Sequence, residues 1–238
     1  MEILWLILFL IVGYLWGSIS FARIVTGIVS PGHDLNKIEL PDANTGGTFQ
    51  LKTVGATTAS MVLGPKYGGI IGILDILKGA LPTLAVRLLF PNQYYFLLIG
   101  LGIVIGHIWP VYFKFRGGGG LSPALGAFMV TAPLGILACV FLAFIIGIFI
   151  LKNIAFAIMG GPTVFIIWSA LLIRKWEIVI FSILLNIILF IAVIPDVKHN
   201  IQAQKEGKVD LSSSMDAIPM GQMMKAMFTK LGVSFDKK

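Results

Sequence analysis

Apolar residues in this chain are gathered into long runs that short polar stretches interrupt. The runs cover residues 3–21, 67–90, 94–108, 122–151, 154–173 and 176–194. A membrane-spanning helix needs about 20 consecutive, mostly apolar residues, and most of these runs approach or exceed that length. The pattern therefore predicts an all-α bundle of transmembrane helices, with the polar stretches as its loops.

The run at 122–151 has two interpretations because Pro133 divides it. It is either one long kinked span or a short helix followed by a second span at 134–151. Lysine and arginine favour the cytoplasmic side of short loops. The first loop holds Arg23, Lys37, Lys52 and Lys66, whereas the turn at 91–93 holds no cation.

These cations place the first loop inside the cell and the N-terminus outside. Seven spans then leave the C-terminus in the cytoplasm, whereas six would leave it outside. We therefore predict a compact bundle of about seven transmembrane helices, with Arg174 and Lys175 as an exception to the charge rule.

Composition agrees with a membrane protein. Hydrophobic residues make up 57% of the 238 and charged residues only 12%, with a mean hydropathy of +0.94. Ordinary globular domains contain about 25% charged residues. The net charge of +7 lies mostly in the loops and the tail, which indicates contact with the lipid bilayer rather than with nucleic acid. The single cysteine, Cys139, leaves no partner for an internal disulfide.

The chain is predicted to divide into a bundle at 1–194 and a polar, lysine-bearing cytoplasmic tail at 195–238. The first apolar run has neither a basic start nor a clear cleavage site, so we interpret it as a retained span. Turn-forming residues dominate 26–52, which predicts a loop with at most one short interfacial helix.

Two ionisable residues, Asp75 and Lys78, lie inside the second run. Spaced three apart, they share one face of a helix and can neutralise each other. One interpretation is an internal ion pair that fixes packing. The other makes this helix the wall of a polar site, with a turn of small residues at 55–58 at its mouth.

A second candidate feature is the run Gly117–Gly120, which follows Lys114 and Arg116. Backbone N–H groups of glycine runs can bind phosphate, and a helix beginning near Ser122 would point its positive end at the same place. A flexible hinge is the alternative. No carboxylate, histidine or cysteine cluster has metal-ligand spacing, so we predict neither a metal nor a cofactor.

Several segments together resemble the bacterial acyl-phosphate:glycerol-3-phosphate acyltransferases, the PlsY family. In chain order they read GSISF at 17–21, GAT at 55–57 with LG at 63–64, DILKG at 75–79, GHIWP at 106–110, KFRGG at 114–118 and KHNI at 198–201. Order and spacing agree from Gly13 to about Lys208, and the segments around Asp75 and His107 are the most specific.

The resemblance implies a seven-helix bundle in the plasma membrane whose motif loops line a cytoplasmic-face cavity. It implies transfer of a fatty acyl group from acyl phosphate to glycerol 3-phosphate, which gives lysophosphatidic acid. The implied substrate- and phosphate-binding residues are Ser18, Gly55, Ala56, Arg116, Gly117, Gly118, Gly119, Gly120, His199 and Asn200. The catalytic residues that we predict are Lys52, Thr57, Thr58 and Lys114, in which Lys52 or Lys114 offsets developing charge and the two threonines orient the substrate. Asp75, Lys78 and His107 are predicted as structural support.

The sequence departs from the family pattern at several polar positions. Gly119 stands where the family's GGKG has lysine, Thr58 replaces the asparagine of GATN, and Met61 replaces an arginine. His199 is next to Asn200 rather than three residues before it. Two other functions therefore stay open, namely a catalytically degenerate homologue that binds lipid or an anionic metabolite, and a small anion transporter. Glycine loops on one face and the absence of visible inverted repeats argue against the transporter.

Overall fold

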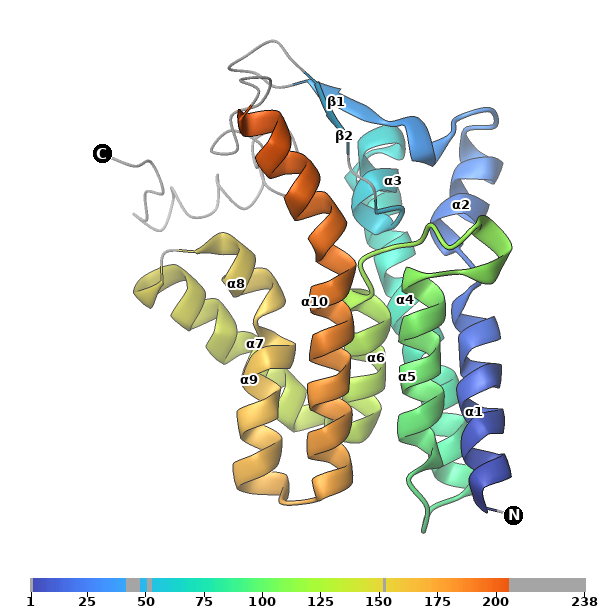
Figure 1. The fold of residues 1–238 in the computed structure, drawn as a ribbon, viewed down its shortest axis with the longest axis vertical. Coiled ribbons are helices and arrows are strands. Elements are labelled where there is room, and N and C mark those ends of the chain that lie inside the picture. The colour runs from blue at the N-terminus through green and yellow to red at the C-terminus, as the bar shows by residue number, and fades with distance from the viewer. Residues whose placement is uncertain (1, 42–47, 51–52, 152, 206–238) are drawn as a thin grey trace. The chain divides into compact units, whose positions relative to one another are not determined.

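The structure is a computed structural model that describes residues 2–41, 48–50, 53–151 and 153–205. Its described elements are α1 (Glu2–Gly17), α2 (Phe21–Val29), η1 (Leu35–Lys37), β1 (Glu39–Pro41), β2 (Thr48–Gln50), α3 (Ala56–Leu63), α4 (Pro65–Leu89), α5 (Tyr95–Ile108), η2 (Val111–Phe113), α6 (Leu121–Thr131), α7 (Pro133–Ile145), η3 (Ile146–Ile150), α8 (Ile154–Met159), α9 (Gly161–Trp168), η4 (Ser169–Ile173) and α10 (Trp176–Lys205) (Figure 1). The elements η3 and η4 are single π-helical turns.

The chain forms two compact units, each described here by itself. Unit 1 comprises residues up to Ile19 and Ile73–Ala192, and unit 2 comprises Ser20–Gly72 and the residues from Val193 onward. Helices α4 and α10 each pass from one unit into the other.

The predicted helical membrane fold is confirmed, with a smaller number of long spans. Among the described residues, five stretches are long and apolar enough to cross a bilayer: Ile3–Val29, Pro65–Leu89, Tyr95–Phe113, Pro133–Ile150 and Trp176–Pro195. Two shorter apolar helices, Leu121–Thr131 and Gly161–Ile173, make up the remaining predicted segments. Within the described residues, the predicted number of seven full spans is therefore not confirmed, because these two helices are too short to cross a bilayer by themselves.

The chain breaks at Pro133, as the two-helix interpretation of 122–151 predicts. Helix α6 ends at Thr131, Ala132 is extended with φ −155° and ψ 85°, and Pro133 opens α7. Proline lacks an N–H and disfavours a helical conformation in the residue before it, which favours a break at this position.

Two local expectations were wrong. The segment after Gly55 is the first turn of α3 rather than a turn of small residues. The loop predicted from residue 26 begins later, because α2 continues to Val29, and it contains a short antiparallel pair in which Leu40 lies opposite Phe49. The last span, predicted at 176–194, agrees with the spanning stretch Trp176–Pro195, and its helix α10 continues beyond that stretch to Lys205. Residues 206–238 of the predicted tail lie outside the described residues.

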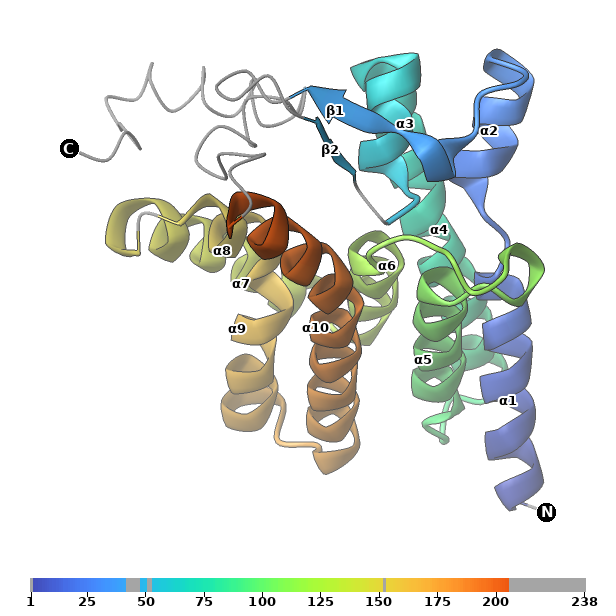
Figure 2. The same cartoon turned by 45° about the horizontal axis from the view of Figure 1, so that its top comes forward.

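Helices α1 and α5 pack closely in unit 1 and lie side by side in both ribbon views (Figures 1 and 2). Glycines from both helices make this approach possible. A Cβ added at Gly13 or Gly17 would overlap the carbonyl oxygen of Ile99 or Ile103. From the other side, a Cβ at Gly102 or Gly106 would overlap the backbone carbonyl of Leu10 or Tyr14. Both pairs have the G-x-x-x-G spacing that lets membrane helices pack backbone to backbone.

Helices α4 and α6 use the same device. A Cβ at Gly79 would overlap the Pro123 carbonyl oxygen, and one at Gly126 would overlap that of Ile76. Helix α5 is therefore held close to α1, and α6 is held close to α4. The glycine loop connects α5 to α6, so both of its ends are fixed.

Substitution of Gly17 with alanine tests the backbone packing of α1 on α5. The added methyl group must push Ile103 away, and overpacking of this kind costs roughly 1–3 kcal/mol. We expect the Tm of the purified protein in detergent to fall by several degrees. Gly27→Ala is the matched control, because a Cβ at Gly27 meets no atom within 4 Å. Equal Tm values for the two variants would contradict the packing account.

Candidate functional site

The loop between α5 and α6 reverses the chain tightly enough to bring its glycines back onto the end of α5. Pro110 follows the C-cap residue Trp109 and stops the helix. Lys114 and Phe115 then adopt left-handed conformations, with φ of 51° and 58°. This conformation is uncommon for residues other than glycine. It is held by a hydrogen bond from the Phe115 N–H to the Pro110 carbonyl at 3.0 Å.

Gly117 and Gly118 lie directly against His107. The Gly118 N–H donates to the His107 carbonyl at 3.1 Å. A Cβ at Gly117 would overlap that same carbonyl oxygen and come within 2.6 Å of Cδ of Pro110, and a Cβ at Gly118 would overlap Nε2 of the His107 ring. These two positions therefore accept no side chain without a shift of the loop.

The other two glycines of the loop have different surroundings. A Cβ at Gly119 meets no atom within 4 Å, so this position has room for a side chain. Gly120 has φ +81° and serves as the N-cap of α6. In the described part of the chain, the amides of Gly117, Gly119 and Gly120 donate no backbone hydrogen bond. With the first-turn N–H groups of α6, they form a set of donors suited to an anion.

Lys114 and Arg116 are both exposed on this loop. The structure therefore places two cations beside the glycine donors, as the sequence predicts. Their charge and the α6 N-terminus would attract a phosphate.

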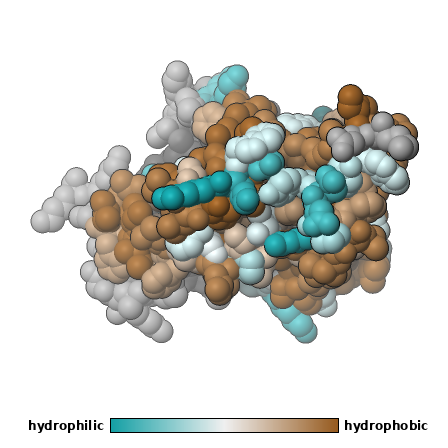
Figure 3. Space-filling model, turned by 90° about the horizontal axis from the view of Figure 1, so that it is seen from below, coloured by the Kyte–Doolittle hydropathy of each residue, from teal (hydrophilic) through white to brown (hydrophobic). Residues whose placement is uncertain are grey.

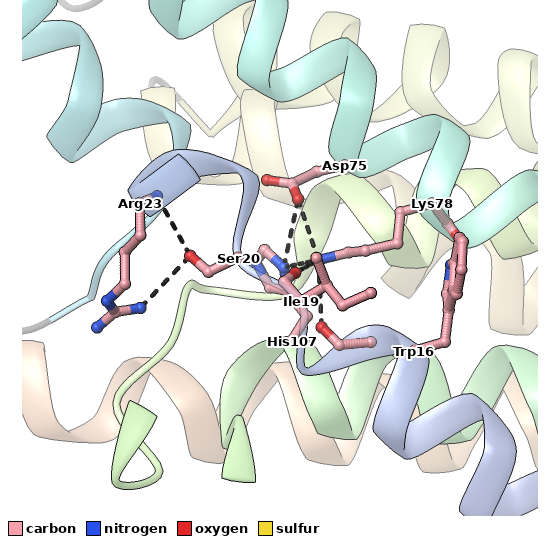
Figure 4. Close-up of polar contacts among 8 residues, drawn as sticks. Trp16, Ile19, Ser20, Arg23, Asp75, Lys78 and His107 are labelled. Atoms are coloured by element: carbon pink, nitrogen blue, oxygen red, sulfur yellow. Dashed lines mark hydrogen bonds and ion pairs between the residues drawn. The ribbon is translucent and has the colours of Figure 1, made fainter. Parts of the chain in front are cut away.

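Lys78 of α4 is buried and contacts residues at the end of α1 and in α5, so it connects three helices (Figure 4). Its Nζ lies 3.1 Å from Oδ1 of Asp75 and 2.9 Å from Nδ1 of His107. It also donates to the carbonyl oxygens of Gly17 at 3.2 Å and Ile19 at 2.8 Å, where α1 ends. The predicted ion pair is thus present, and it is part of a larger network. When Lys78 donates to Nδ1, the neutral His107 carries its proton on Nε2, the atom next to Gly118.

Ser18 reinforces the same junction. Its hydroxyl is fully buried, donates to the Tyr14 carbonyl at 2.8 Å and accepts from the Val111 N–H at 3.3 Å. The Tyr14 hydroxyl donates to the Trp109 carbonyl at 2.9 Å. Hydrogen bonds therefore connect the end of α1 to the start of the α5–α6 loop, and the Ser18 hydroxyl makes two of them.

In unit 2, the segment at 55–58 opens helix α3. Gly55 is its N-cap residue and Ala56 its first residue. Thr57 is exposed, whereas Thr58 is buried and donates its hydroxyl to the Thr53 carbonyl at 2.5 Å. The Thr58 side chain thus holds the approach to α3 in place.

Unit 2 also contains a polar cluster that the sequence analysis did not single out. Arg23 donates to the Ser20 hydroxyl and to Oδ1 of Asn36, and Asn36 donates to Asp34 from both its backbone and its side chain (Figure 4 shows the Arg23–Ser20 contact). The two hydrogen bonds that Asp34 accepts from Asn36 are the main reason that the pKa of Asp34 lies below its ordinary value. The sequence signal for the Arg23–Ser20 contact is the spacing of these two residues, because Ser20 is the N-cap residue of α2 and Arg23 follows three residues later.

The remaining predicted site residues are not all described. Lys52 lies outside the described residues, as do the side chains of His199 and Asn200, whose backbone belongs to α10. Within unit 1, the structure brings together Ser18, Lys78, His107 and the glycine loop. Gly55, Ala56, Thr57 and Thr58 are neighbours in unit 2. The roles predicted for all of them stay predictions.

The chain matches a protein-family model described as glycerol-3-phosphate acyltransferase over residues 7–207. The chain is an integral membrane protein, because its fold is helical and five of its described stretches are long and apolar enough to cross a bilayer. It belongs to the glycerol-3-phosphate acyltransferase family, which confirms the family predicted from its motifs.

Individual relatives agree with this assignment. A glycerol-3-phosphate acyltransferase of Myxococcus xanthus is 40% identical over 129 residues, which span 54% of this chain and 61% of that relative. Glycerol-3-phosphate acyltransferase 2 of Bacillus anthracis is 35% identical over 185 residues, which span 78% of this chain and 90% of that relative.

Among solved structures, the chain is similar to PlsY (YgiH), an integral membrane glycerol 3-phosphate acyltransferase, in its glycerol 3-phosphate form. The TM-score is 0.66 at 26% identity, over 86% of this chain and 94% of PlsY. A second crystal structure of the same protein, its lysophosphatidic acid form, gives a TM-score of 0.65.

The buried charges predict a strong response to removal of Lys78. In Lys78→Met, the Asp75 carboxylate stays buried without its cation, and breaking a buried pair in this way costs about 3–5 kcal/mol. We expect a large fall in Tm in detergent, with part of the loss regained in the double variant Asp75→Asn/Lys78→Met.

Lys66→Met is the matched control, because Lys66 is exposed on the same helix. A Lys78→Met variant that melts with the wild type would show that the network does not hold the three helices together.

Proposed function

We propose that this protein transfers a fatty acyl group from acyl phosphate to the 1-hydroxyl of glycerol 3-phosphate. The products are lysophosphatidic acid and inorganic phosphate, so the reaction is a step of phospholipid synthesis. Family membership supports the proposal, as does similarity to a PlsY structure in its glycerol 3-phosphate form. The observation that carries it is the glycine loop, whose free backbone donors and flanking cations suit a phosphate group.

In this proposal the phosphate of a substrate lies on the loop. Backbone N–H groups of Gly119 and Gly120 donate to it, as do those of Leu121 and Ser122 at the start of α6. Arg116 adds a fork of charged donors. Gly117 and Gly118 serve a different purpose, because their lack of side chains lets the loop rest on His107. Lys114, or Lys52, offsets the negative charge that develops during transfer.

The chemical step needs few groups from the protein. The acceptor hydroxyl attacks the acyl carbon, the bond between that carbon and the phosphate oxygen breaks, and the departing phosphate can take the hydroxyl proton. Catalysis is then mainly positioning and charge stabilisation. Thr57 is the exposed hydroxyl that can orient a substrate, and Thr58 fixes the start of α3 through its bond to Thr53.

Removal of the Arg116 guanidinium tests the phosphate-binding role of the loop. In Arg116→Ala we expect the KM for glycerol 3-phosphate to rise about tenfold, since losing one charged contact of roughly 1.4 kcal/mol gives that factor, with a smaller change in kcat. Steady-state acyl transfer from palmitoyl phosphate measures both constants. Arg174→Ala is the control, because that exposed arginine lies in the turn before α10. An unchanged KM in Arg116→Ala would remove Arg116 from the site.

We further propose that the protein lies in the plasma membrane with its N-terminus outside, its glycine loop at the cytoplasmic face and its C-terminus in the cytoplasm. Lysine and arginine are concentrated in the loop that follows the first span, and the turn at 91–93 carries no cation. Because α5 connects that turn to the glycine loop, the two ends of α5 lie on opposite sides of the membrane.

Cysteine labelling in intact cells tests this orientation. The native Cys139 is buried, so a membrane-impermeant maleimide should leave the parent protein unlabelled. We expect it to label Asn92→Cys before lysis and Tyr112→Cys only after lysis, because the two exposed positions lie beyond opposite ends of α5. The reverse labelling pattern would invert the proposed topology.

A further inference from the structure

Two adjoining cavities lie in unit 1 at the end of α5 that is far from the glycine loop. The larger has a volume of about 480 Å³ and is lined mainly by apolar side chains of α5 and α10, among them Leu98, Leu101 and Leu184. The smaller, of about 350 Å³, is lined by more polar groups, including Arg87 and Thr131. Gln93 and Tyr94 line both cavities. This end of the bundle faces the viewer in Figure 3, where hydrophilic side chains stand among hydrophobic ones.

The smaller cavity contains a cation with donors to spare. The guanidinium of Arg87 uses Nη1 on the carbonyl oxygens of Val130 and Thr131 and lies 5.3 Å from the centre of the Phe96 ring. Those contacts hold the end of α6. Among the described residues, Nε and Nη2 of this planar group make no hydrogen bond, so they can donate to a bound anion.

The larger cavity is lined in part by Glu177, whose carboxylate lacks a hydrogen-bond donor at one oxygen among the described residues. Oε2 of Glu177 is buried, and in the described part of the chain it accepts no hydrogen bond. Its position in the first turn of α10 explains why a negative charge is tolerated there. It does not explain a buried oxygen without a donor, which costs about 1–3 kcal/mol or more for a charged group.

We propose that these cavities together bind one phospholipid whose head group carries both a phosphate and a primary ammonium group. One acyl chain occupies the larger cavity, the phosphate accepts hydrogen bonds from Arg87, and the ammonium donates to the carboxylate of Glu177, a residue that lines the larger cavity. This lipid site is separate from the glycine loop and goes beyond the proposed acyl transfer.

Three observations select this occupant. The larger cavity has the size and apolar lining of a small-molecule site, which suits a hydrocarbon chain. Its rim carries the exposed aromatic residues Tyr94 and Trp176, which are typical of the membrane–water interface. The two charges are of opposite sign on adjoining cavities, which matches a zwitterion. A purely anionic head group would meet Glu177, and a quaternary ammonium has no N–H to donate.

Native mass spectrometry of the detergent-solubilised protein tests the proposal with dioleoyl phosphatidylethanolamine, phosphatidylcholine and phosphatidylglycerol. We expect the ethanolamine lipid to bind about tenfold more tightly than the other two, as one additional charge-assisted hydrogen bond would give. In Glu177→Gln the preference over the choline lipid should disappear. In Leu98→Trp, which fills the larger cavity, all three lipids should bind more weakly.

Asp34→Asn is the matched control, because it makes the same acid-to-amide change at a residue that lines neither cavity. It should keep the wild-type preference. Equal affinities of the wild type for the three lipids would overturn the proposal, even if the variants fail to fold. A preference that persists in Glu177→Gln would also overturn it. Acyl transfer is measured separately, so failure of the lipid site leaves the proposed function standing.

Discussion

A buried ammonium group holds the centre of unit 1 together. Lys78 is surrounded by protein on all sides, and taking its charge out of water is costly unless every donor finds an acceptor. Asp75 supplies the opposite charge from one turn earlier on α4, the carbonyls of Gly17 and Ile19 are unpaired because α1 ends there, and His107 comes from the last turn of α5. One charge therefore joins α4, the end of α1 and the end of α5.

This constraint also shapes the candidate site. His107 is held by Lys78 on one side of its ring, and its other side supports the glycine loop at Gly118. The loop can rest there only because Gly117 and Gly118 have no side chains. Gly119 is different, since it has open space where the family pattern has a lysine. Losing one preorganised charge at a reacting phosphate typically costs roughly 10² to 10³-fold in rate. In the proposed reaction Lys52, Lys114 and Arg116 are the residues that supply the compensating charge.

The sequence was sufficient for features that depend on local composition or spacing. The bounds of α4 and α5 follow from apolar length, and the Asp75–Lys78 pair follows from helical spacing. The break at Pro133 was one of two interpretations, and the distribution of lysine and arginine among the loops favoured it. The contact of Lys78 with His107 could not be predicted, because the two residues are 29 positions apart and meet only through the packing of α4 on its neighbours. The paired G-x-x-x-G spacings of α1 and α5 were a readable signal for the packing of these two helices on each other. The continuation of α10 through Pro195 differs from the usual effect of proline, which breaks or kinks a helix, and the local sequence did not predict it.

The most direct test of the account is acyl transfer by the purified wild-type protein in detergent, from palmitoyl phosphate to labelled glycerol 3-phosphate, with Gly119→Lys assayed alongside. The account predicts labelled lysophosphatidic acid from the wild type, with more from the variant, since the structure leaves room for a lysine side chain at position 119 of the glycine loop. Product from the variant alone would identify a degenerate site in an intact scaffold. Absence of product from both proteins would contradict the proposed reaction.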